Sequence, residues 1–266
     1  MLSKNKIKFI NSIKKKKYRD AHGLFFVEGE KLVDELLQSE AKISTIYATQ
    51  DWIEQYQQII DRKKVKPCLV SNDELKKISA LSTPNRVLAT VSIPQNHYNK
   101  TDIARQLSLL LDQVSDPGNL GTIIRIADWF GIQNIFCTPD SVDLYNPKVV
   151  QATMGAIFRV KVHYADFRDL LKDFSEYQDF PIYGTFLEGE NIYQHPLNNK
   201  GFIIMGNESR GISPQWESFI KQKLFIPNYP APEKSSESLN LSAATAIVCS
   251  EFRRRPWSSI QNGRRP

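Results

Sequence analysis

Cysteine is scarce in this sequence, and its scarcity argues against two kinds of protein. The 266 residues contain three cysteines, Cys68, Cys137 and Cys249, which lie far apart. An odd, scattered set does not make a disulfide framework, and no two of them have the spacing of metal ligands. We therefore expect no metal site, and a reduced, cytoplasmic setting fits the three thiols best.

Long apolar runs are missing as well. The longest of them, such as Leu107–Leu111, fall well short of the ~20 residues that a membrane-spanning helix needs. The lysine-rich N-terminal segment lacks the apolar core and the small-residue cleavage site of a secretory signal. No convincing internal repeat is present. We therefore expect no membrane association.

The sequence does contain enough apolar residues for a core, together with an excess of basic ones. Hydrophobic residues make up 41% of the chain, which excludes a largely disordered protein. Lysine and arginine outnumber aspartate and glutamate by 35 to 29, a formal charge of +6. This balance favours a polyanionic partner, with nucleic acid ahead of an anionic membrane, although a merely basic soluble protein has the same composition.

Hydrophobic patterning divides the chain into two regions. Residues 1–95 predict a small α/β unit, in which strand-like and helix-like apolar spacings follow one another. The polar segment 96–106 predicts a linker. A larger α/β domain is predicted over residues 107–255, and residues 256–266 form a tail.

Six short apolar strands are predicted in the larger region, with helical patterns between several of them. Apolar strands that alternate with helices indicate a mostly parallel sheet covered on both faces. Ligands of such sheets gather at the carboxyl ends of the strands. The predicted strands are Ser108–Asp112, Asn134–Thr138, Val160–Tyr164, Ile182–Phe186, Phe202–Met205 and Leu224–Ile226.

The first notable segment behind a strand is Asp116 to Arg125. Asp116-Pro117-Gly118 has the chemistry of a turn, and Asn119 is a suitable N-cap for the helix that follows. Arg125 stands off the apolar stripe of that helix and should project above the carboxyl edge of the sheet. The segment lacks the glycine spacing and the lysine of phosphate-binding loops. By itself it is equally compatible with a cap and a surface ion pair.

The second segment, Gly206 to Gly211, comes directly after an apolar strand. A glycine at position 206 lets a ligand approach the backbone closely, and Glu208 follows two residues later. Gly211 closes the loop. An ordinary strand-to-helix turn with a solvated glutamate would have the same pattern.

The third segment begins at Ile226-Pro227 and resumes after a loop with Ser238-Leu239-Asn240-Leu241-Ser242. Ser238 or Asn240 is the candidate N-cap of a final helix that is rich in small residues. Arg253–Arg255 near its end complement the helix dipole, with an RNA contact as the alternative.

Together and in this order, the three segments resemble the motifs of the SpoU class of the SPOUT superfamily, the RNA ribose 2′-O-methyltransferases. The resemblance covers residues 107–255. In addition, Phe25-Phe26-Val27-Glu28-Gly29 is similar to the substrate-binding domain often fused to these enzymes, which has an α/β/α fold like that of a ribosomal protein. The resemblance implies a deep trefoil knot in the C-terminal part, S-adenosylmethionine bound in the knot, a homodimer, and structured RNA as substrate, with ribosomal RNA ahead of transfer RNA.

The resemblance also implies roles for individual residues. Five residues fall on catalytic positions, namely Asn119, Arg125, Glu208, Ser238 and Asn240. Three fall on positions that hold the cofactor, largely through backbone groups, namely Gly206, Ile226 and Leu239. A basic run of the N-terminal unit is our candidate for binding RNA phosphates, with a solvated helix face as the alternative, and it comprises Lys14, Lys15, Lys16, Lys17 and Arg19.

One stretch departs from the family pattern. Residues 228–237, between the two halves of the third segment, contain two prolines and no glycine. The family usually has a shorter link there, with a glycine in it. The stretch is either a local insertion or a change in the path of the cofactor loop.

The residue set suits methyl transfer to a ribose hydroxyl, which requires alignment and the loss of a weakly acidic proton. Alignment can lower the barrier by about 7–11 kcal/mol, and base assistance adds a factor of about 10²–10⁴. A guanidinium is a poor base, so we expect Arg125 to orient the 2′-oxygen and stabilise the alkoxide. Three alternatives stay open: a methyltransferase of base nitrogens, a non-catalytic RNA-binding or ribosome-assembly protein, and a dinucleotide oxidoreductase, which would lack its glycine fingerprint.

Overall fold

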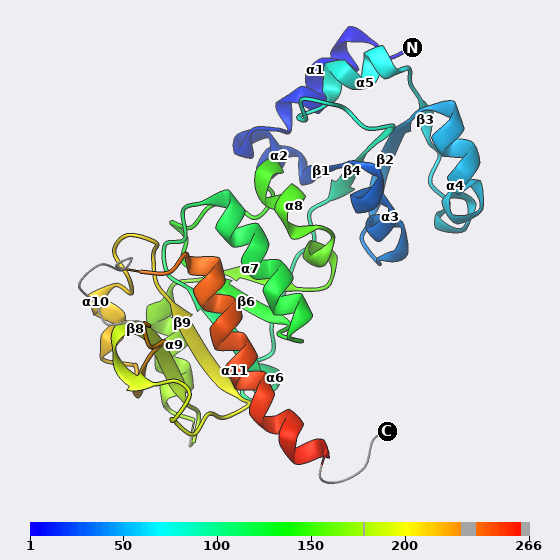
Figure 1. Cartoon of the computed structure of the whole chain (residues 1–266). Coiled ribbons are helices and arrows are strands. Elements are labelled where there is room, and N and C mark those ends of the chain that lie inside the picture. Colours follow the sequence, from blue (N-terminus) through cyan, green and yellow to red (C-terminus); the bar gives the residue numbers. More distant parts are fainter. Residues whose placement is uncertain (178, 230–237, 262–266) are drawn as a thin grey trace. The chain divides into compact units, whose positions relative to one another are not determined.

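A computed structural model describes residues 1–177, 179–229 and 238–261, with side chains as far as Arg254. The chain forms two compact units (Figure 1). Unit 1 consists of residues 1–95 and 143–159, and unit 2 of residues 96–142 and those from 160 onward. Residues 143–159 thus pack with the N-terminal unit, although the sequence pattern groups them with the larger region.

Unit 1 is built on a four-stranded sheet with the strand order β1-β4-β2-β3. Its outer strand β1 alternates strictly, because Phe25 and Val27 join one apolar cluster and Phe26 joins another. Side chains that point alternately to opposite faces require a cover on each face. The strands are β1 (Leu24–Glu28), β2 (Ile43–Ala48), β3 (Cys68–Leu69) and β4 (Val87–Ser92).

Helices cover both faces of this sheet. The cluster that contains Phe25 includes side chains of α3 (Glu30–Gln38) and α4 (Gln50–Lys63). The cluster that contains Phe26 includes side chains of α1 (Lys4–Ser12) and α5 (Asn72–Ile78). The predicted α/β/α layering of the N-terminal unit is therefore confirmed. The short α2 (Lys16–His22) links α1 to β1.

The segment 143–159 completes the core of unit 1. It contains α8 (Pro147–Thr153) and the 3₁₀ helix η1 (Ala156–Phe158). Val150 is buried among the side chains of α3 and α4, and the Tyr145 ring lies 4.5 Å from the Phe25 ring. Gln151 Nε2 donates a 2.7 Å hydrogen bond to the carbonyl oxygen of Glu28. Burial and hydrogen bonding together hold this segment in unit 1.

Unit 2 contains a six-stranded sheet in which every neighbouring pair is parallel. The strand order is β10-β8-β9-β5-β6-β7, so the chain crosses over repeatedly between strands. The predicted parallel sheet is confirmed, and five of the six predicted strands match the observed ones to within two residues, while β8 extends further. The strands are β5 (Leu107–Leu111), β6 (Asn134–Cys137), β7 (Lys161–Tyr164), β8 (Ile182–Asn191), β9 (Gly201–Met205) and β10 (Gln222–Phe225).

Helices also cover both faces of the parallel sheet. On one face, α9 (Phe167–Ser175) and α10 (Pro214–Glu217) pack on Leu110 and Phe202. On the other face, α7 (Pro117–Trp129) and α11 (Leu241–Gln261) lie side by side (Figure 1). A further short helix, α6 (Lys100–Ile103), precedes β5.

The sheet order places the first two motifs together. Strands β5 and β9 are neighbours, with Leu111 opposite Met205, so the segments that follow them leave the sheet at the same edge. The third motif reaches this edge after β10, but residues 230–237 lie outside the described part of the chain, so the trefoil knot and the altered link at 228–237 stay predictions. None of the described helices is long and apolar enough to cross a membrane.

Candidate active site

Helix α7 begins three residues earlier than the sequence suggests. Asp116 is its N-cap and accepts a 2.8 Å hydrogen bond from the backbone N–H of Asn119, while Pro117 takes the first helical position. The prediction that Asn119 caps this helix is therefore wrong. Proline suits the first turn because its fixed φ is helical and it has no N–H to leave unpaired. As a consequence, the Asn119 side chain is free for other partners.

Glu208 accepts hydrogen bonds from the Asn119 side chain and from the residues at the start of the first motif. Its Oε1 accepts a 3.0 Å hydrogen bond from Asn119 Nδ2 and a 3.3 Å bond from the backbone N–H of Asp116. Its Oε2 accepts longer bonds from the backbone N–H and hydroxyl of Ser115, at 3.5 and 3.4 Å. Partial burial by itself would raise the pKa of the Glu208 carboxyl, but the hydrogen bonds outweigh it and lower this pKa. Glu208 is therefore an ionised anchor and a poor proton acceptor.

Asn240 joins the third motif to the first. Its Nδ2 donates a 3.0 Å hydrogen bond to Asn119 Oδ1, so both ends of the Asn119 amide are fixed. Its own Oδ1 accepts from the backbone N–H groups of Ser242 and Ala243, at 2.9 and 3.3 Å. Asn240 therefore caps the start of α11, one of the two caps that the sequence predicts. The three motifs meet in a single Glu208–Asn119–Asn240 network.

Asn207 is a part of the site that sequence reasoning missed. Its Oδ1 accepts the backbone N–H groups of Ser209 and Arg210, at 3.0 and 3.1 Å, which shapes the loop around Glu208. Its Nδ2 donates to the carbonyl oxygen of Gln113 at 2.7 Å and to Glu208 Oε2 at 3.3 Å. The sequence could have indicated this role, because an asparagine stands between the glycine and the acid of the second motif and asparagine side chains commonly close such turns.

The backbone conformation explains why the second motif has glycine at positions 206 and 211. A Cβ on Gly206 would lie 2.2 Å from the carbonyl carbon of Gly211, so no larger residue fits where the loop closes on itself. Gly211 has φ +69°, a left-handed value that favours glycine. The backbones of these loop ends are also paired, because Asn207 and Gly211 exchange hydrogen bonds of 2.9 and 3.0 Å.

Arg125 and Ser238 lie outside the network. Arg125 stands on the exposed side of α7, off its apolar stripe, as expected. Within the described chain neither side chain has a hydrogen bond or an ion pair. The structure thus brings Asn119, Glu208 and Asn240 together and leaves the guanidinium of Arg125 and the hydroxyl of Ser238 available to a substrate.

The three residues predicted to hold the cofactor have unused backbone groups. Gly206, Ile226 and Leu239 form no backbone hydrogen bond with any other residue that the structure describes. Leu239 is 52% exposed and directly precedes Asn240 of the polar network. Free amides and carbonyls next to an exposed apolar side chain fit an adenosine-containing cofactor, which offers both hydrogen-bonding and apolar edges.

Metal chemistry receives no support from the described residues. They contain no group of three or more histidine, cysteine, aspartate or glutamate side chains that could hold an ion. An open hollow of about 670 Å³ does occur in unit 2, bounded by residues such as Pro181, Tyr183 and Lys221. It lies at the beginning of β8 and β10, whereas the three motifs follow the carboxyl ends of strands, so we do not assign it to the site.

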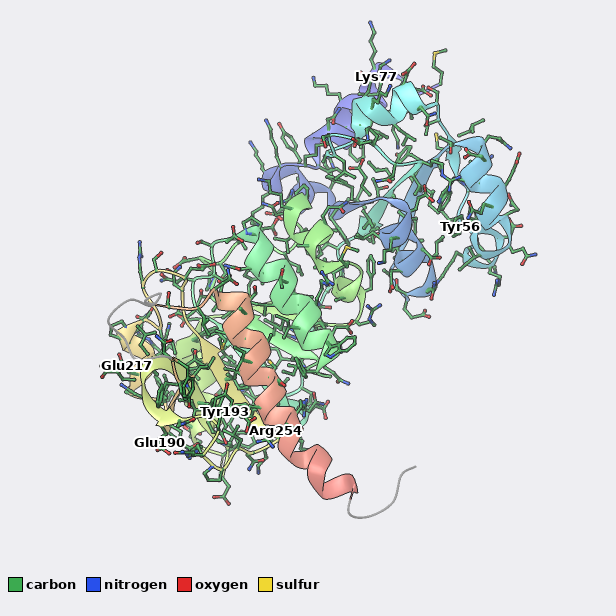
Figure 2. The ribbon with its side chains drawn as sticks, in the orientation of Figure 1. Tyr56, Lys77, Glu190, Tyr193, Glu217 and Arg254 are labelled. Atoms are coloured by element: carbon green, nitrogen blue, oxygen red, sulfur yellow. The ribbon has the colours of Figure 1, made fainter. Side chains whose placement is uncertain are left out.

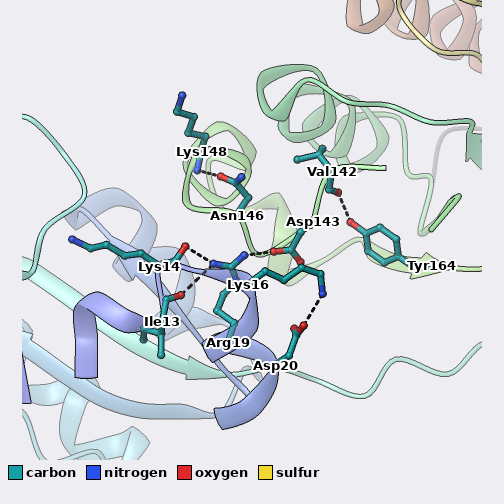
Figure 3. Close-up of polar contacts among 10 residues, drawn as sticks. All are labelled: Ile13, Lys14, Lys16, Arg19, Asp20, Val142, Asp143, Asn146, Lys148 and Tyr164. Atoms are coloured by element: carbon teal, nitrogen blue, oxygen red, sulfur yellow. Dashed lines mark hydrogen bonds and ion pairs between the residues drawn. The ribbon is translucent and has the colours of Figure 1, made fainter. Parts of the chain in front are cut away.

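The basic run of unit 1 separates into residues with different surroundings. Arg19 is only 3% exposed, donates hydrogen bonds to the carbonyl oxygens of Ile13 and Lys14, and forms an ion pair with Asp143 (Figure 3). Contrary to its predicted role, Arg19 is therefore a structural residue that cannot reach an RNA phosphate. Its burial follows from the turn between α1 and α2, whose carbonyl groups it binds.

The four lysines of the run differ among themselves. Lys14 is partly buried, and its Nζ donates a 2.7 Å hydrogen bond to the carbonyl oxygen of Ser79. Burial lowers the pKa of the Lys14 ammonium group. Lys16 pairs with Asp20 at 2.7 Å (Figure 3). Lys15 and Lys17 are exposed, and each lacks an ion-pair partner among the described residues.

Arg253 and Arg254 of α11 have structural partners, whereas the Arg255 side chain lies outside the described part of the chain. Arg253 donates to the carbonyl oxygens of Phe130 and Gly131, at 2.8 and 3.2 Å, and so caps the end of α7. Arg254 forms a bidentate pair with Glu251 at 2.9 Å and points outward from the helix (Figure 2). For both residues the structure favours a local role over the alternative of an RNA contact. The helix continues to Gln261.

Comparison with known proteins agrees with this arrangement. Residues 106–250 match the model of the SpoU rRNA methylase family, and residues 4–89 match the MRM3-like substrate-binding domain. The chain is 28% identical to the 23S rRNA (guanosine(2553)-2′-O)-methyltransferase RlmP of Bacillus subtilis over 93% of this chain and 96% of the relative.

Solved structures match over nearly the same length of the chain. A putative RNA methyltransferase of the TrmH family from Porphyromonas gingivalis superposes with a TM-score of 0.84 and 39% identity, over 96% of this chain and 99% of that one. An AdoMet-bound rRNA methyltransferase from Sinorhizobium meliloti gives a TM-score of 0.83 and 28% identity, over 96% of each chain. The protein thus belongs to the SpoU rRNA methylase family.

Proposed function

We propose that this protein transfers the methyl group of S-adenosylmethionine to a ribose 2′-hydroxyl of ribosomal RNA. The observation that carries the proposal is the network in which Glu208, Asn119 and Asn240 join three separate motifs at one edge of the parallel sheet. Its family relatives include 2′-O-methyltransferases of 23S rRNA, which favours large-subunit RNA as the substrate.

Different residues of the chain bind the cofactor and the ribose. When bound, the cofactor supplies an electrophilic methyl group. Gly206, Ile226 and Leu239 would hold it through backbone groups that have no partner among the described residues, and through the exposed leucine side chain. The site needs no metal in this scheme, because the methyl donor is already activated.

Arg125 and the network act on the ribose. The exposed guanidinium orients the 2′-oxygen and stabilises the negative charge that develops as the hydroxyl proton passes to solvent water and the oxygen bonds to the methyl group. The lone pairs of the Glu208 carboxylate are already engaged by Asn119, Ser115 and Asp116, so Glu208 fixes geometry and does not take the proton. Ser238 offers a free hydroxyl for a further contact with the substrate.

A homodimer is part of this proposal. Trp129 is 85% exposed, one helical turn beyond Arg125 on the same side of α7. A tryptophan this exposed is typical of a surface that another molecule covers. The neighbouring helix α11 exposes small residues such as Ala243 and Ser250, which allow close approach of a second copy. Light scattering at micromolar concentration tests this, since Trp129→Glu should convert a dimer into monomers, whereas a monomeric wild type would contradict it.

The proposed setting is the cytoplasm, on the ground that all three cysteines are free thiols and Cys137 and Cys249 are buried. The test of the function is a map of 2′-O-methylated positions in total RNA from cells with and without the protein. We expect one ribosomal position to lose its methyl group. If a transfer RNA position loses its methyl group instead, transfer RNA is the substrate. An unchanged map combined with no S-adenosylmethionine binding by calorimetry would favour a non-catalytic RNA-binding protein.

A further inference from the structure

The positive charge of this protein is concentrated at one end of the chain. Residues 1–23 contain seven lysines, Arg19 and a single acid, Asp20, which gives a net charge of +7. The whole chain has a net charge of +6, so the remaining 243 residues sum to −1. The basic character of the protein therefore resides in α1, α2 and the turn between them.

The structure separates the charges that serve the fold from those that do not. Arg19, Lys14 and Lys16 are engaged by Asp143, the carbonyl of Ser79 and Asp20 respectively. Lys6 lies over the rings of Phe9 and Tyr47, with its Nζ at 5.5 and 5.8 Å from their centroids. Four side chains are exposed and have no ion pair or hydrogen bond to the described residues, namely Lys4, Lys8, Lys15 and Lys17.

Three of these four lysines lie at helix N-termini, where they weaken the helices. Lys4 begins α1, Lys15 is the N-cap of α2, and Lys17 lies in its first turn. Neither helix has an acidic residue in its first turn. Positive charge near a helix N-terminus is unfavourable because it opposes the helix dipole. These lysines thus oppose the helix dipole, and no gain in stability offsets this. Such an unfavourable placement of charge indicates that the lysines bind a partner.

For the four lysines with no partner, RNA is a more suitable binding partner than a membrane. Membrane-binding helices expose large apolar side chains beside their lysines. Here the apolar residues Ile10 and Ile13 are fully buried in the core of unit 1. Tyr18 is 40% exposed, as part of α2. The surface thus offers charge without an apolar face to insert.

We propose that Lys4, Lys8, Lys15 and Lys17 form the surface through which the protein binds the phosphate backbone of its RNA substrate. This deepens the proposed function and rests on it for the choice of RNA. Arg19 supports the surface from beneath, because it ties the turn between α1 and α2 to Asp143, which leads into α8 with its exposed Lys148 (Figure 3). Contacts to phosphates carry little sequence information, so this surface supplies affinity and orientation.

The test compares two variants of the full chain that lose equal charge from unit 1. The first is K4Q/K8Q/K15Q/K17Q. The matched control is K31Q/K42Q/K64Q/K66Q, which replaces four other exposed lysines of the same unit that also have no ion pair within the described chain. The probe is a fluorescent RNA duplex of mixed sequence, and the affinity is measured over a series of salt concentrations.

Each lost phosphate contact lowers the slope of log affinity against log salt by about 0.7–0.9, so the first variant should lose about 3 in slope. The control should keep the slope of the wild type. Equal slopes for the two variants would overturn the proposal. Binding to vesicles of phosphatidylcholine and phosphatidylglycerol is measured for the same proteins. The proposal would also be overturned if the first variant lost affinity for these vesicles but kept its affinity for RNA.

A second measurement separates this proposal from the proposed function. The affinity for S-adenosylmethionine, measured by calorimetry, should be unchanged in K4Q/K8Q/K15Q/K17Q, because none of these lysines belongs to the Glu208–Asn119–Asn240 network or to the residues predicted to hold the cofactor. If the wild type transfers no methyl group but the slope still falls in the first variant alone, the surface stands and the enzymatic function fails. A weakened affinity for S-adenosylmethionine in the first variant alone would contradict a role limited to RNA binding.

Discussion

The Nδ2 atom of Asn119 lies 3.0 Å from Oε1 of Glu208, across 89 residues of sequence. The same Asn119 amide accepts a hydrogen bond from Asn240 through its oxygen. An amide whose two ends are both engaged has a single orientation. The polar edge of the parallel sheet is therefore ordered before any ligand arrives, which is the arrangement that electrostatic catalysis requires.

Replacing the anchor should impair catalysis more than cofactor binding. In Glu208→Gln, an amide N–H₂ would face donors of Asn119 or Asp116, and the network would lose its orientation. We expect the single-turnover rate of methyl transfer to fall about 10- to 100-fold, with S-adenosylmethionine affinity changed only a few-fold by calorimetry. A rate equal to that of the wild type would show that the network is a structural feature alone.

Asn207 offers a test based on pH. Hydrogen bonds keep the pKa of Glu208 low, so the wild type should not lose activity through this group until the pH falls below the usual range of a glutamate. Asn207→Asp can still accept the N–H groups of Ser209 and Arg210, but it places a negative charge beside Glu208. A nearby like charge raises the pKa of a carboxyl.

The acidic limb of the pH–rate profile should therefore move to higher pH in Asn207→Asp. Asn207→Ser is the control, because it loses the donor without adding a charge. It should lower the rate and leave the acidic limb in place. Superimposable limbs for the aspartate variant and the wild type would exclude electrostatic coupling between positions 207 and 208.

The Arg19–Asp143 ion pair should be important for the stability of unit 1. Both side chains are largely buried, with 4% and 18% exposure. Removing one partner of a buried pair leaves the other charge unpaired and typically costs about 3–5 kcal/mol. We expect Arg19→Met to lower the midpoint of thermal unfolding strongly, and Arg19→Met with Asp143→Leu to restore much of it. A single variant as stable as the wild type would contradict the structural role of Arg19.

His163 should make stability depend on pH. Burial, followed by the nearby charges of Lys161 and His97, lowers the pKa of His163 to about 4. An unfolded chain would take up a proton near the ordinary pKa of about 6.5. The unfolded state therefore binds more protons between these values, and the protein should lose stability as the pH falls from about 6.5 to about 4.

The two pKa values correspond to a loss of up to about 3 kcal/mol in the free energy of unfolding. His163→Gln keeps a polar group near Asn134, which contacts the His163 ring at 3.2 Å, but does not titrate. Denaturant unfolding at a series of pH values should show a shallower pH dependence for this variant. The same slope in variant and wild type would place the pH dependence elsewhere.

Much of the architecture could be predicted from the sequence because its strands are short, apolar and separated by clear turns. The buried run at Phe202–Met205, which matches β9 to within one residue, is an example. The first helices were missed because lysines at positions 4, 6 and 8 obscure the helical spacing of Ile7 and Ile10. The affiliation of residues 143–159 with unit 1 depends on tertiary packing of Val150 and Tyr145, which local sequence does not encode.

The site divides in the same way. Asn119, Glu208 and Asn240 could be chosen from motif order, and they meet in the structure. The hydrogen bonds between these residues could not be predicted. They join Asn119 to Glu208 across 89 residues and to Asn240 across 121 residues, and such pairing depends on the order of the strands in the sheet. Arg19 was misassigned because a basic residue in a lysine run gives no sign of burial, which arises only when the chain folds back from Asp143.

The most direct test of the function is methyl transfer with purified components. The full chain is incubated with radiolabelled S-adenosylmethionine and unmodified large-subunit ribosomal RNA, and the labelled nucleoside is identified after digestion. We predict a single 2′-O-methylated nucleoside with the wild type, and a rate reduced at least ~100-fold in Arg125→Ala if its guanidinium stabilises the alkoxide. Label on a base nitrogen, or near-normal single-turnover transfer by Arg125→Ala, would contradict this account.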